Sequence, residues 1–459
     1  MKTLRLFFKK ISYSNRVFKD RTRKRGFHWA ITASIGALLL SGSGIVLAND
    51  QFPETHASVQ DLIKAGYKSN PEIQAAYSRW EASRERIHAR RTLPDPAVGY
   101  TYYLESVETR VGPQEGAASV TQRLPWLGKL RLEGRIAEKQ AAAARYHYEA
   151  TVQRVAAEIE EAYWDYLYLL KAITTTEQNL ELLRNWEKVA MSKYTTARAG
   201  HPDIIKAQVE VLALEDRLAS LQQMQIPVVQ RLSAAVGVPL TVESIGVNPI
   251  PIQELPVAEE NLPNELLTRN PSLAAERAMI EAAELGLRRS RLNYRPDFMV
   301  GGKVVFTGEN PALGNDPENG KDPIMFTLGL SIPIHLKKYR SLEQASRAEW
   351  KSAELTTRNL ENKFLAQLER TVFEFQDAAR KIRLYEEALI PRAEQALVAS
   401  EAAYVSDRVD FLTLIETHRA LLDYQLSYQK ALADQAGHHA RLSALLGRYT
   451  GNDLSSEEN

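Results

Sequence analysis

The chain has 459 residues, of which 44% are hydrophobic and 25% charged, with a net charge of +1 at pH 7. This composition can bury a core but is too polar for a bundle of membrane helices. The lack of cysteine excludes a disulfide scaffold, a thiolate metal site, a cysteine nucleophile and a lipidated N-terminal cysteine. Positions 1–48 hold ten of the 58 basic but one of the 57 acidic residues, so the remainder is acidic, which disfavours nucleic-acid binding.

The first 48 residues have the order of a secretory signal peptide. A basic stretch ends at Arg25, an apolar run follows from Trp29 to Ala48, and Val46 and Ala48 offer small residues for cleavage. The alternative is a permanent anchor, since about 20 apolar residues can span a bilayer. No later segment has the pattern of a membrane helix. The exported chain is therefore expected to be soluble or to enter a membrane as β-strands.

The two halves of the chain resemble each other. Asn70-Pro71 recurs as Asn270-Pro271, and the stretch 233–237 recurs as 443–447, with further matches in the same order. A collinear repeat of about 200 residues predicts two structural units, which we place at 49–251 and 252–459.

Each unit is predicted to contain a helix, a strand pair and two long helices. In the first unit the expected elements are a helix over 58–91, strands over 97–105 and 117–124, and helices over 127–196 and 203–236, the last bent at Pro227. In the second they are a helix over 262–292, strands over 298–306 and 324–334, and helices over 337–406 and 411–446. Apolar residues of the long helices recur at threes and fours, which is typical of coiled coils.

All four strand segments alternate between apolar and polar residues, most regularly over 324–334. A half-buried sheet in a soluble domain gives this pattern, and so does a membrane barrel. The strands are about 10 residues long, as a tilted membrane strand requires, and export together with the lack of any other predicted membrane element favours the barrel. Because four strands cannot close a barrel in lipid, three chains would have to contribute twelve strands. The hairpin tips would then be 106–115 and 308–323.

Several stretches resemble the TolC family of outer-membrane efflux proteins. Residues 121–130 (TQRLPWLGKL) resemble the family's strand-to-helix junction, whose junction residues here are Pro125, Trp126 and, in the second unit, Pro333. Residues 204–218 (IIKAQVEVLALEDRL) and 404–425 (YVSDRVDFLTLIETHRALLDYQ) resemble its two helix-tip motifs. The resemblance extends over essentially the whole chain after the signal and leans towards the CusC/CzcC-like metal-efflux branch.

The resemblance implies an α+β membrane protein and a homotrimer. A 12-stranded transmembrane β-barrel, four strands from each chain, would continue into a long coiled-coil α-helical barrel. The protein would lie in the outer membrane of a Gram-negative bacterium and extend into the periplasm. Its implied function is that of a passive exit duct for small molecules or metal cations in a tripartite efflux system. Its implied partners are a periplasmic adaptor (membrane fusion) protein and an inner-membrane efflux pump.

The resemblance also places a gate at the periplasmic helix tips. Three copies of Asp407 and Asp410 would surround a narrow opening with carboxylates, which favours cations and is sensitive to pH. The expected gate residues are Asp407, Asp410, Tyr404, Arg408, Arg198 and Asp203. The expected adaptor contacts are Ile204, Ile205, Leu412 and Leu414. The other interpretations are solvated turn residues for the first set and an intramolecular seam for the second. The family usually has a glycine near this turn, where the chain has Asp407 and Arg408.

The sequence contains no catalytic constellation. His438 and His439 are adjacent and therefore point to different faces of a helix, without a partner four residues away. No enzymatic activity, cofactor or metal site is expected. Two alternatives to the channel remain: a periplasmic coiled-coil adaptor or structural spacer, and an anchored rod that retains residues 29–48. Metal ions, drugs, dyes and exported proteins all stay open as cargo.

Overall fold

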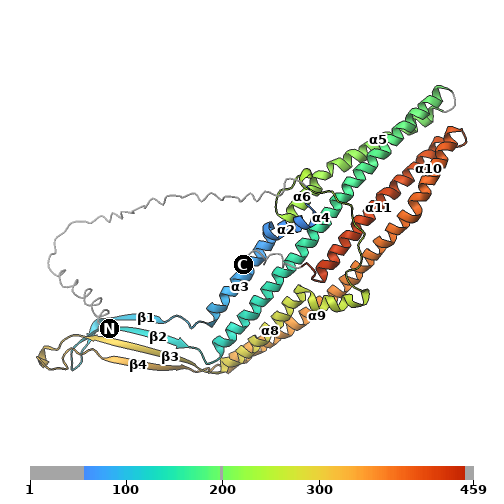
Figure 1. Cartoon of the computed structure of the whole chain (residues 1–459). Coiled ribbons are helices and arrows are strands. Elements are labelled where there is room, and N and C mark those ends of the chain that lie inside the picture. Colours follow the sequence, from blue (N-terminus) through green and yellow to red (C-terminus); the bar gives the residue numbers. More distant parts are fainter. Residues whose placement is uncertain (1–55, 197–199, 450–459) are drawn as a thin grey trace, which may run out of the picture. The chain divides into compact units, whose positions relative to one another are not determined.

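The computed structural model describes residues 56–196 and 200–449, so the predicted signal peptide and Arg198 lie outside the described residues. Figure 1 shows the elements in chain order. The first series is α2 (Val59–Ser69), α3 (Pro71–Arg91), β1 (Ala97–Val107), β2 (Gln114–Leu124), α4 (Lys129–Thr195), α5 (His201–Gln223) and α6 (Gln225–Val236). The second is α7 (Leu262–Arg269), α8 (Pro271–Arg291), β3 (Asp297–Thr307), β4 (Ile324–Ser331), α9 (Leu336–Leu384), the π-helical turn η5 (Tyr385–Leu389), α10 (Ile390–Val405) and α11 (Phe411–Leu445).

The first helix of each series is divided in two, so the predictions of continuous helices over 58–91 and 262–292 are wrong. The breaks fall at Asn70 and Asn270, whose backbones are extended because each precedes a proline at the first position of the next helix. The Asn70 side chain accepts a hydrogen bond from the Glu72 N–H at 2.8 Å and donates one to the Ala235 carbonyl at 2.7 Å. The hydrogen bond to Ala235 therefore holds the α2–α3 corner against the end of α6.

The later helices follow the prediction, with interruptions near their prolines. The helix expected over 203–236 is interrupted at Met224, between α5 and α6, three residues before Pro227. The helix expected over 337–406 contains the π-helical turn η5, which ends just before Pro391. Proline lacks the N–H that would continue the helical ladder, so a local change of pitch is the ordinary consequence.

The four strands form one antiparallel sheet in the order β1-β2-β3-β4 (Figure 1). The register pairs Tyr100 with Ala118, Ala118 with Val304, and Val304 with Ile324. Paired residues share a face, so away from the register shifts near the hairpin ends the even-numbered positions of all four strands form one mainly apolar face, with Gln122 as an exception. The odd-numbered positions, among them Thr101, Ser119 and Thr327, form the opposite and mainly polar face.

The apolar face is exposed. Val98 is 78% exposed, Leu104 93% and Leu328 72%, and Ile332 and Ile334 continue the exposed row beyond the end of β4. In a soluble domain a second layer would cover such a face. No element in residues 56–196 and 200–449 does so.

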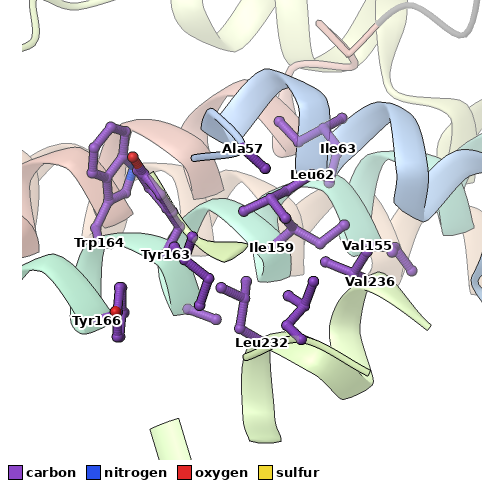
Figure 2. Close-up of a cluster of buried hydrophobic side chains, with 14 of the residues drawn as sticks. Ala57, Leu62, Ile63, Val155, Ile159, Tyr163, Trp164, Tyr166, Leu232 and Val236 are labelled. Carbon is purple, nitrogen blue, oxygen red and sulfur yellow. The ribbon is translucent and has the colours of Figure 1, made fainter. Parts of the chain in front are cut away.

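The helical part is organised around α4, which contacts α3, α8 and α11 (Figure 1). Figure 2 shows a buried cluster in which Ile159 and Tyr163 of α4 meet Leu62 of α2 and Leu232 of α6. The Tyr163 hydroxyl donates to the Gly246 carbonyl at 2.9 Å, which also holds the connection after α6 against α4. A second buried cluster lies towards the ends of α4 and α10 and includes Leu183, Leu397 and Phe411.

One partly buried carboxylate in α4 makes stability depend on pH. Burial raises the pKa of Glu160 to about 7, although a hydrogen bond with Tyr449 lowers it in part. A pKa above the unfolded value means that the group costs stability as the pH rises from about 4 through 7. We expect Glu160→Gln to raise the free energy of unfolding by about 2 kcal/mol at pH 8 and to change little at pH 4. Chemical denaturation at both pH values measures this.

The matched control is Glu181→Gln, which changes an exposed carboxylate of the same helix. It should leave the stability unchanged at both pH values. Equal effects of Glu160→Gln at pH 4 and pH 8 would contradict the assignment of the raised pKa.

Among the described helices, none combines the length and the apolar character needed to cross a membrane.

Candidate functional site

The ends of two helix pairs meet through Lys193, near the end of α4. Its ammonium group donates hydrogen bonds to the Tyr404 carbonyl and, at 2.5 Å, to the Asp407 carboxylate. The same group lies 4.4 Å from the centre of the Tyr404 ring. The Lys193 side chain is only 12% exposed, so these contacts replace most of its water. Lys193 thus joins the α4–α5 tip to the α10–α11 tip within one chain.

Asp407 occupies a backbone position that normally favours glycine. Its φ is +59°, in the left-handed region. The Arg408 N–H donates to the Ala403 carbonyl at 2.8 Å and the Asp407 N–H to the Tyr404 carbonyl at 3.2 Å, which is the Schellman ending of α10. The corresponding ending after α11 uses Gly447, at φ +70°. Aspartate therefore provides the turn that the family's glycine was expected to provide, and adds a charge that faces Lys193.

Asp410 is the N-cap of α11. Its carboxylate accepts hydrogen bonds from the Thr413 backbone N–H at 3.0 Å and the Thr413 hydroxyl at 2.6 Å. These bonds, the hydroxyl first, hold the pKa of Asp410 below its usual range. With a lowered pKa, the cap's stabilisation is present above about pH 4 and is lost as the pH falls through the folded pKa.

Tyr404 is buried within the tip rather than presented at its surface. Its ring packs against Trp186 and Phe411, at centroid distances of 6.2 and 5.4 Å. Burial, with Asp203 and Asp407 nearby, raises the pKa of its hydroxyl to about 12. Within the described residues this hydroxyl has no hydrogen-bond partner. Tyr404 therefore serves as a packing group under Lys193 in the isolated chain.

The remaining predicted residues differ in how far their side chains are buried. Arg408 is exposed, and its guanidinium donates to the Ser406 hydroxyl at 2.9 Å. Ile204 and Leu414 are 3% and 0% exposed, which is the arrangement of an intramolecular seam, whereas Ile205 and Leu412 are 45% and 39% exposed. Only the second pair is available to a partner in this arrangement.

Substitutions of Asp407 separate its backbone role from its charge. Asp407→Asn tolerates the left-handed turn but loses the charge beside Lys193, so we expect the tip's opening free energy to fall by about 1 kcal/mol. Asp407→Val adds backbone strain of roughly 1–2 kcal/mol to that loss. Hydrogen exchange of the backbone amides at the end of α10 measures both. Equal effects of asparagine and valine would show that the turn carries no conformational constraint.

A second polar centre lies where strands meet helices. Asp297, at the start of β3, accepts hydrogen bonds from the Lys129 ammonium at 2.7 Å and the Trp126 backbone N–H at 2.8 Å. Arg123 approaches its other carboxylate oxygen at 3.2 Å. The Lys129 and Asp297 side chains are only 9% and 14% exposed. Pro125 and Trp126 lie in the link from β2 to α4, so this centre fixes the strand-to-helix turn against the neighbouring strand.

The corresponding link in the second series has no such centre. Pro333 lies between β4 and α9, where the Ile334 and Leu336 N–H groups each donate to a carbonyl two residues earlier at 3.0 Å. These tight turns redirect the chain within the stretch 332–335.

Lys193 and Asp297 were not among the predicted site residues. Their partners lie 214 and 168 positions away in the sequence, so no local pattern marks either one. The signal in the sequence that could have pointed to them is the internal repeat, because aligning the two halves matches one helix tip with the other and one strand-to-helix junction with the other.

The sequence profile for outer membrane efflux proteins matches residues 62–238 and 262–448, which is most of the chain. The chain belongs to the outer membrane efflux protein family. No curated protein matches the sequence significantly. The family consists of channel proteins, so the prediction of a TolC-like efflux protein without enzymatic activity is confirmed.

Solved structures of efflux channels share the fold of this outer membrane efflux protein. The outer-membrane channel OprN is 16% identical with a TM-score of 0.72, over 85% of this chain and 89% of that one. VceC of Vibrio cholerae is 17% identical with a TM-score of 0.70, over 85% and 96%. CusC is 12% identical with a TM-score of 0.70, over 84% and 91%.

Proposed function

We propose that three copies of this efflux protein form an outer-membrane channel, the passive exit duct of a tripartite efflux system. The exposed apolar face formed by the even-numbered strand positions carries the proposal. Lipid is the partner that satisfies such a face on strands about 10 residues long. The open edges of β1 and β4 would pair between chains, which gives a closed barrel of twelve strands.

The polar face would then line the lumen, and α4, α9, α10 and α11 would continue the duct into the periplasm. We propose in addition that residues 1–48 are a cleaved signal and that the two structural units are 49–251 and 252–459. A periplasmic adaptor or spacer is the alternative. It is disfavoured because nothing in the described residues covers the apolar face.

We further propose that the tips containing Asp407 and Asp410 form the gate, with Tyr404, Asp203, Arg408 and Arg198 around it. Opening would separate the α4–α5 tip from the α10–α11 tip and break the Lys193–Asp407 pair. Ile205 and Leu412 are the apolar residues of these tips that an adaptor helix would contact. An inner-membrane pump would supply the energy for transport.

The cargo we propose is small molecules or metal cations. Asp407 remains 48% exposed beside Lys193, so three copies would keep carboxylates at the opening and favour cations. Among the described residues no group of three or more histidine or acidic side chains could hold a metal ion, so a metal would pass without a resident site. The likeness to CusC is no greater than that to OprN, and it does not select the metal branch.

Fractionation of cells that express the full-length chain tests the proposal. We expect detergent-insoluble outer-membrane protein whose N-terminus is Asn49 and which crosslinks as a trimer. A soluble periplasmic product, or an inner-membrane product with an intact N-terminus, would contradict it and favour the adaptor or the anchored rod.

A further inference from the structure

The chain is strongly polarised in charge along its strands. The four eleven-residue segments on the helix side of the strands, 86–96, 125–135, 286–296 and 332–342, contain 13 basic and two acidic residues. The two hairpin tips at the other end, 108–113 and 308–323, contain two basic and five acidic residues. The apolar face thus lies between a basic end and an acidic end.

Many of the basic side chains at the helix end are not used in ion pairs. Arg90, Arg131, Lys337 and Arg340 are exposed, and none of them forms a salt bridge within the described residues. By contrast, Arg289 and Arg291 are paired with Glu133 and Glu343. Packing in the chain therefore does not account for this concentration of positive charge.

One cation of this end, Arg295, lies directly beyond the apolar face. Phe298 belongs to that face, and the Trp126 ring stacks on it at 5.8 Å with an interplanar angle of 17°. The Arg295 guanidinium lies over the Trp126 ring at 5.9 Å. Along the surface, the apolar strand is followed by an aromatic ring and then by a cation. This is the order expected where a protein passes from the lipid interior into the headgroup region.

The neighbouring strand repeats this order. The exposed side chains of Ile332 and Ile334 continue the β4 row, and the Lys338 ammonium lies 5.6 Å from the centre of the Tyr339 ring. The Tyr339 ring contacts that of Tyr294 at 6.1 Å, which joins this second pair to the short 3-10 helix Leu292–Tyr294 that follows α8. Both aromatic–cation pairs therefore lie at one level, immediately beyond the apolar face.

The basic residues of the four segments at the helix end, with Arg295 and Lys338 at their centre, are called the basic belt. We propose that this belt binds the headgroups of anionic phospholipids in the periplasmic leaflet of the outer membrane. The inference rests on the proposed membrane placement of the strands. Each cation near an anionic membrane surface adds about 1 kcal/mol, or roughly fivefold in affinity. The belt would set the depth of the channel in the membrane. The acidic tips at the other end of the strands would be repelled by the same anionic headgroups.

The test uses the purified full chain in detergent and counts bound phosphatidylglycerol and phosphatidylcholine by native mass spectrometry. We expect phosphatidylglycerol to bind at least about tenfold more tightly. Arg295→Gln/Lys338→Gln should abolish that preference, and the charge-conserving Arg295→Lys/Lys338→Arg should retain it, which separates charge from packing. Lys171→Gln/Arg392→Gln, which removes two exposed cations far from the junction in sequence, is the matched control and should also retain it.

Three results would overturn the proposal. They are a wild-type protein without lipid preference, an equal loss in the control variant, and displacement of phosphatidylglycerol by millimolar inorganic phosphate, which would show recognition of any free anion. Failure of the channel proposal is scored separately, by fractionation. If the protein is in the outer membrane but shows no preference for phosphatidylglycerol, only the lipid-binding proposal is contradicted. If the protein is found outside the outer membrane, the proposed membrane placement is contradicted.

Discussion

Asp297→Ala is expected to lower the free energy of unfolding by about 3–5 kcal/mol, the cost of leaving one member of a buried ion pair without its partner. The change removes the hydrogen-bond acceptor of Lys129, whose side chain is 9% exposed, and of the Trp126 backbone N–H. Both groups lie where β2 turns into α4. The measurement is the temperature or urea concentration at which the purified protein loses its assembled form.

The control for this prediction replaces both partners by apolar residues of similar size, in Asp297→Leu/Lys129→Met. Because no charge then remains buried, we expect most of the lost stability to return. If the double variant is as unstable as Asp297→Ala, the side-chain volume at the junction matters and the ion pair does not. A stable Asp297→Ala protein would show that the junction does not depend on this centre.

Lys193→Met is expected to open the tip. The ammonium group holds the Tyr404 carbonyl and the Asp407 carboxylate, and hydrogen bonds to charged groups contribute about 1.5–3 kcal/mol each. Methionine keeps most of the side chain's volume but forms neither bond. If the tips form the gate as proposed, the loss of both bonds should raise the ratio of open to closed channels by at least about 100-fold. Single-channel conductance in planar bilayers measures it, and cells should become sensitive to large antibiotics that the outer membrane normally excludes.

Lys188→Met is the matched control, since Lys188 lies on the same helix and its ammonium group donates a long hydrogen bond to Asn185, at 3.5 Å, without a salt bridge among the described residues. It should leave the conductance unchanged. Lys193→Met/Asp407→Asn should open the channel no further than Lys193→Met alone, because one interaction is removed by either change. A closed Lys193→Met channel would mean that the two tips are held by contacts other than this pair.

The elements were readable from the sequence where a periodic pattern extends over many residues. The alternation over 324–334 predicted β4, although the strand ends at Ser331, and the seams of threes and fours predicted α4, α9 and α11. The break at Asn70 was missed because Pro71 is also compatible with the first turn of a longer helix. The sequence also does not show the contact that holds the break in place, the hydrogen bond from Asn70 to the carbonyl of Ala235, 165 residues away.

The residues proposed for the gate were predicted from motifs, but the bonds that they form were not. The helix-tip motifs located Asp407 and Asp410, yet the pairing of Asp407 with Lys193 depends on two tips that the fold brings together. The turn at Asp407 shows a related limit. Aspartate is one of the few side chains that accept a positive φ, so the missing glycine changed the chemistry of the turn and left its geometry intact.

In the proposed channel, the even-numbered face of the sheet meets lipid while the odd-numbered face lines water. Since the chain has no cysteine, single cysteines can be placed at Thr327, Leu328, Leu330 and Ser331 of β4 and labelled in outer-membrane vesicles with a water-soluble maleimide. We expect labelling of Thr327→Cys and Ser331→Cys and protection of Leu328→Cys and Leu330→Cys until the protein is denatured. Equal labelling of all four positions, or the reverse alternation, would contradict it.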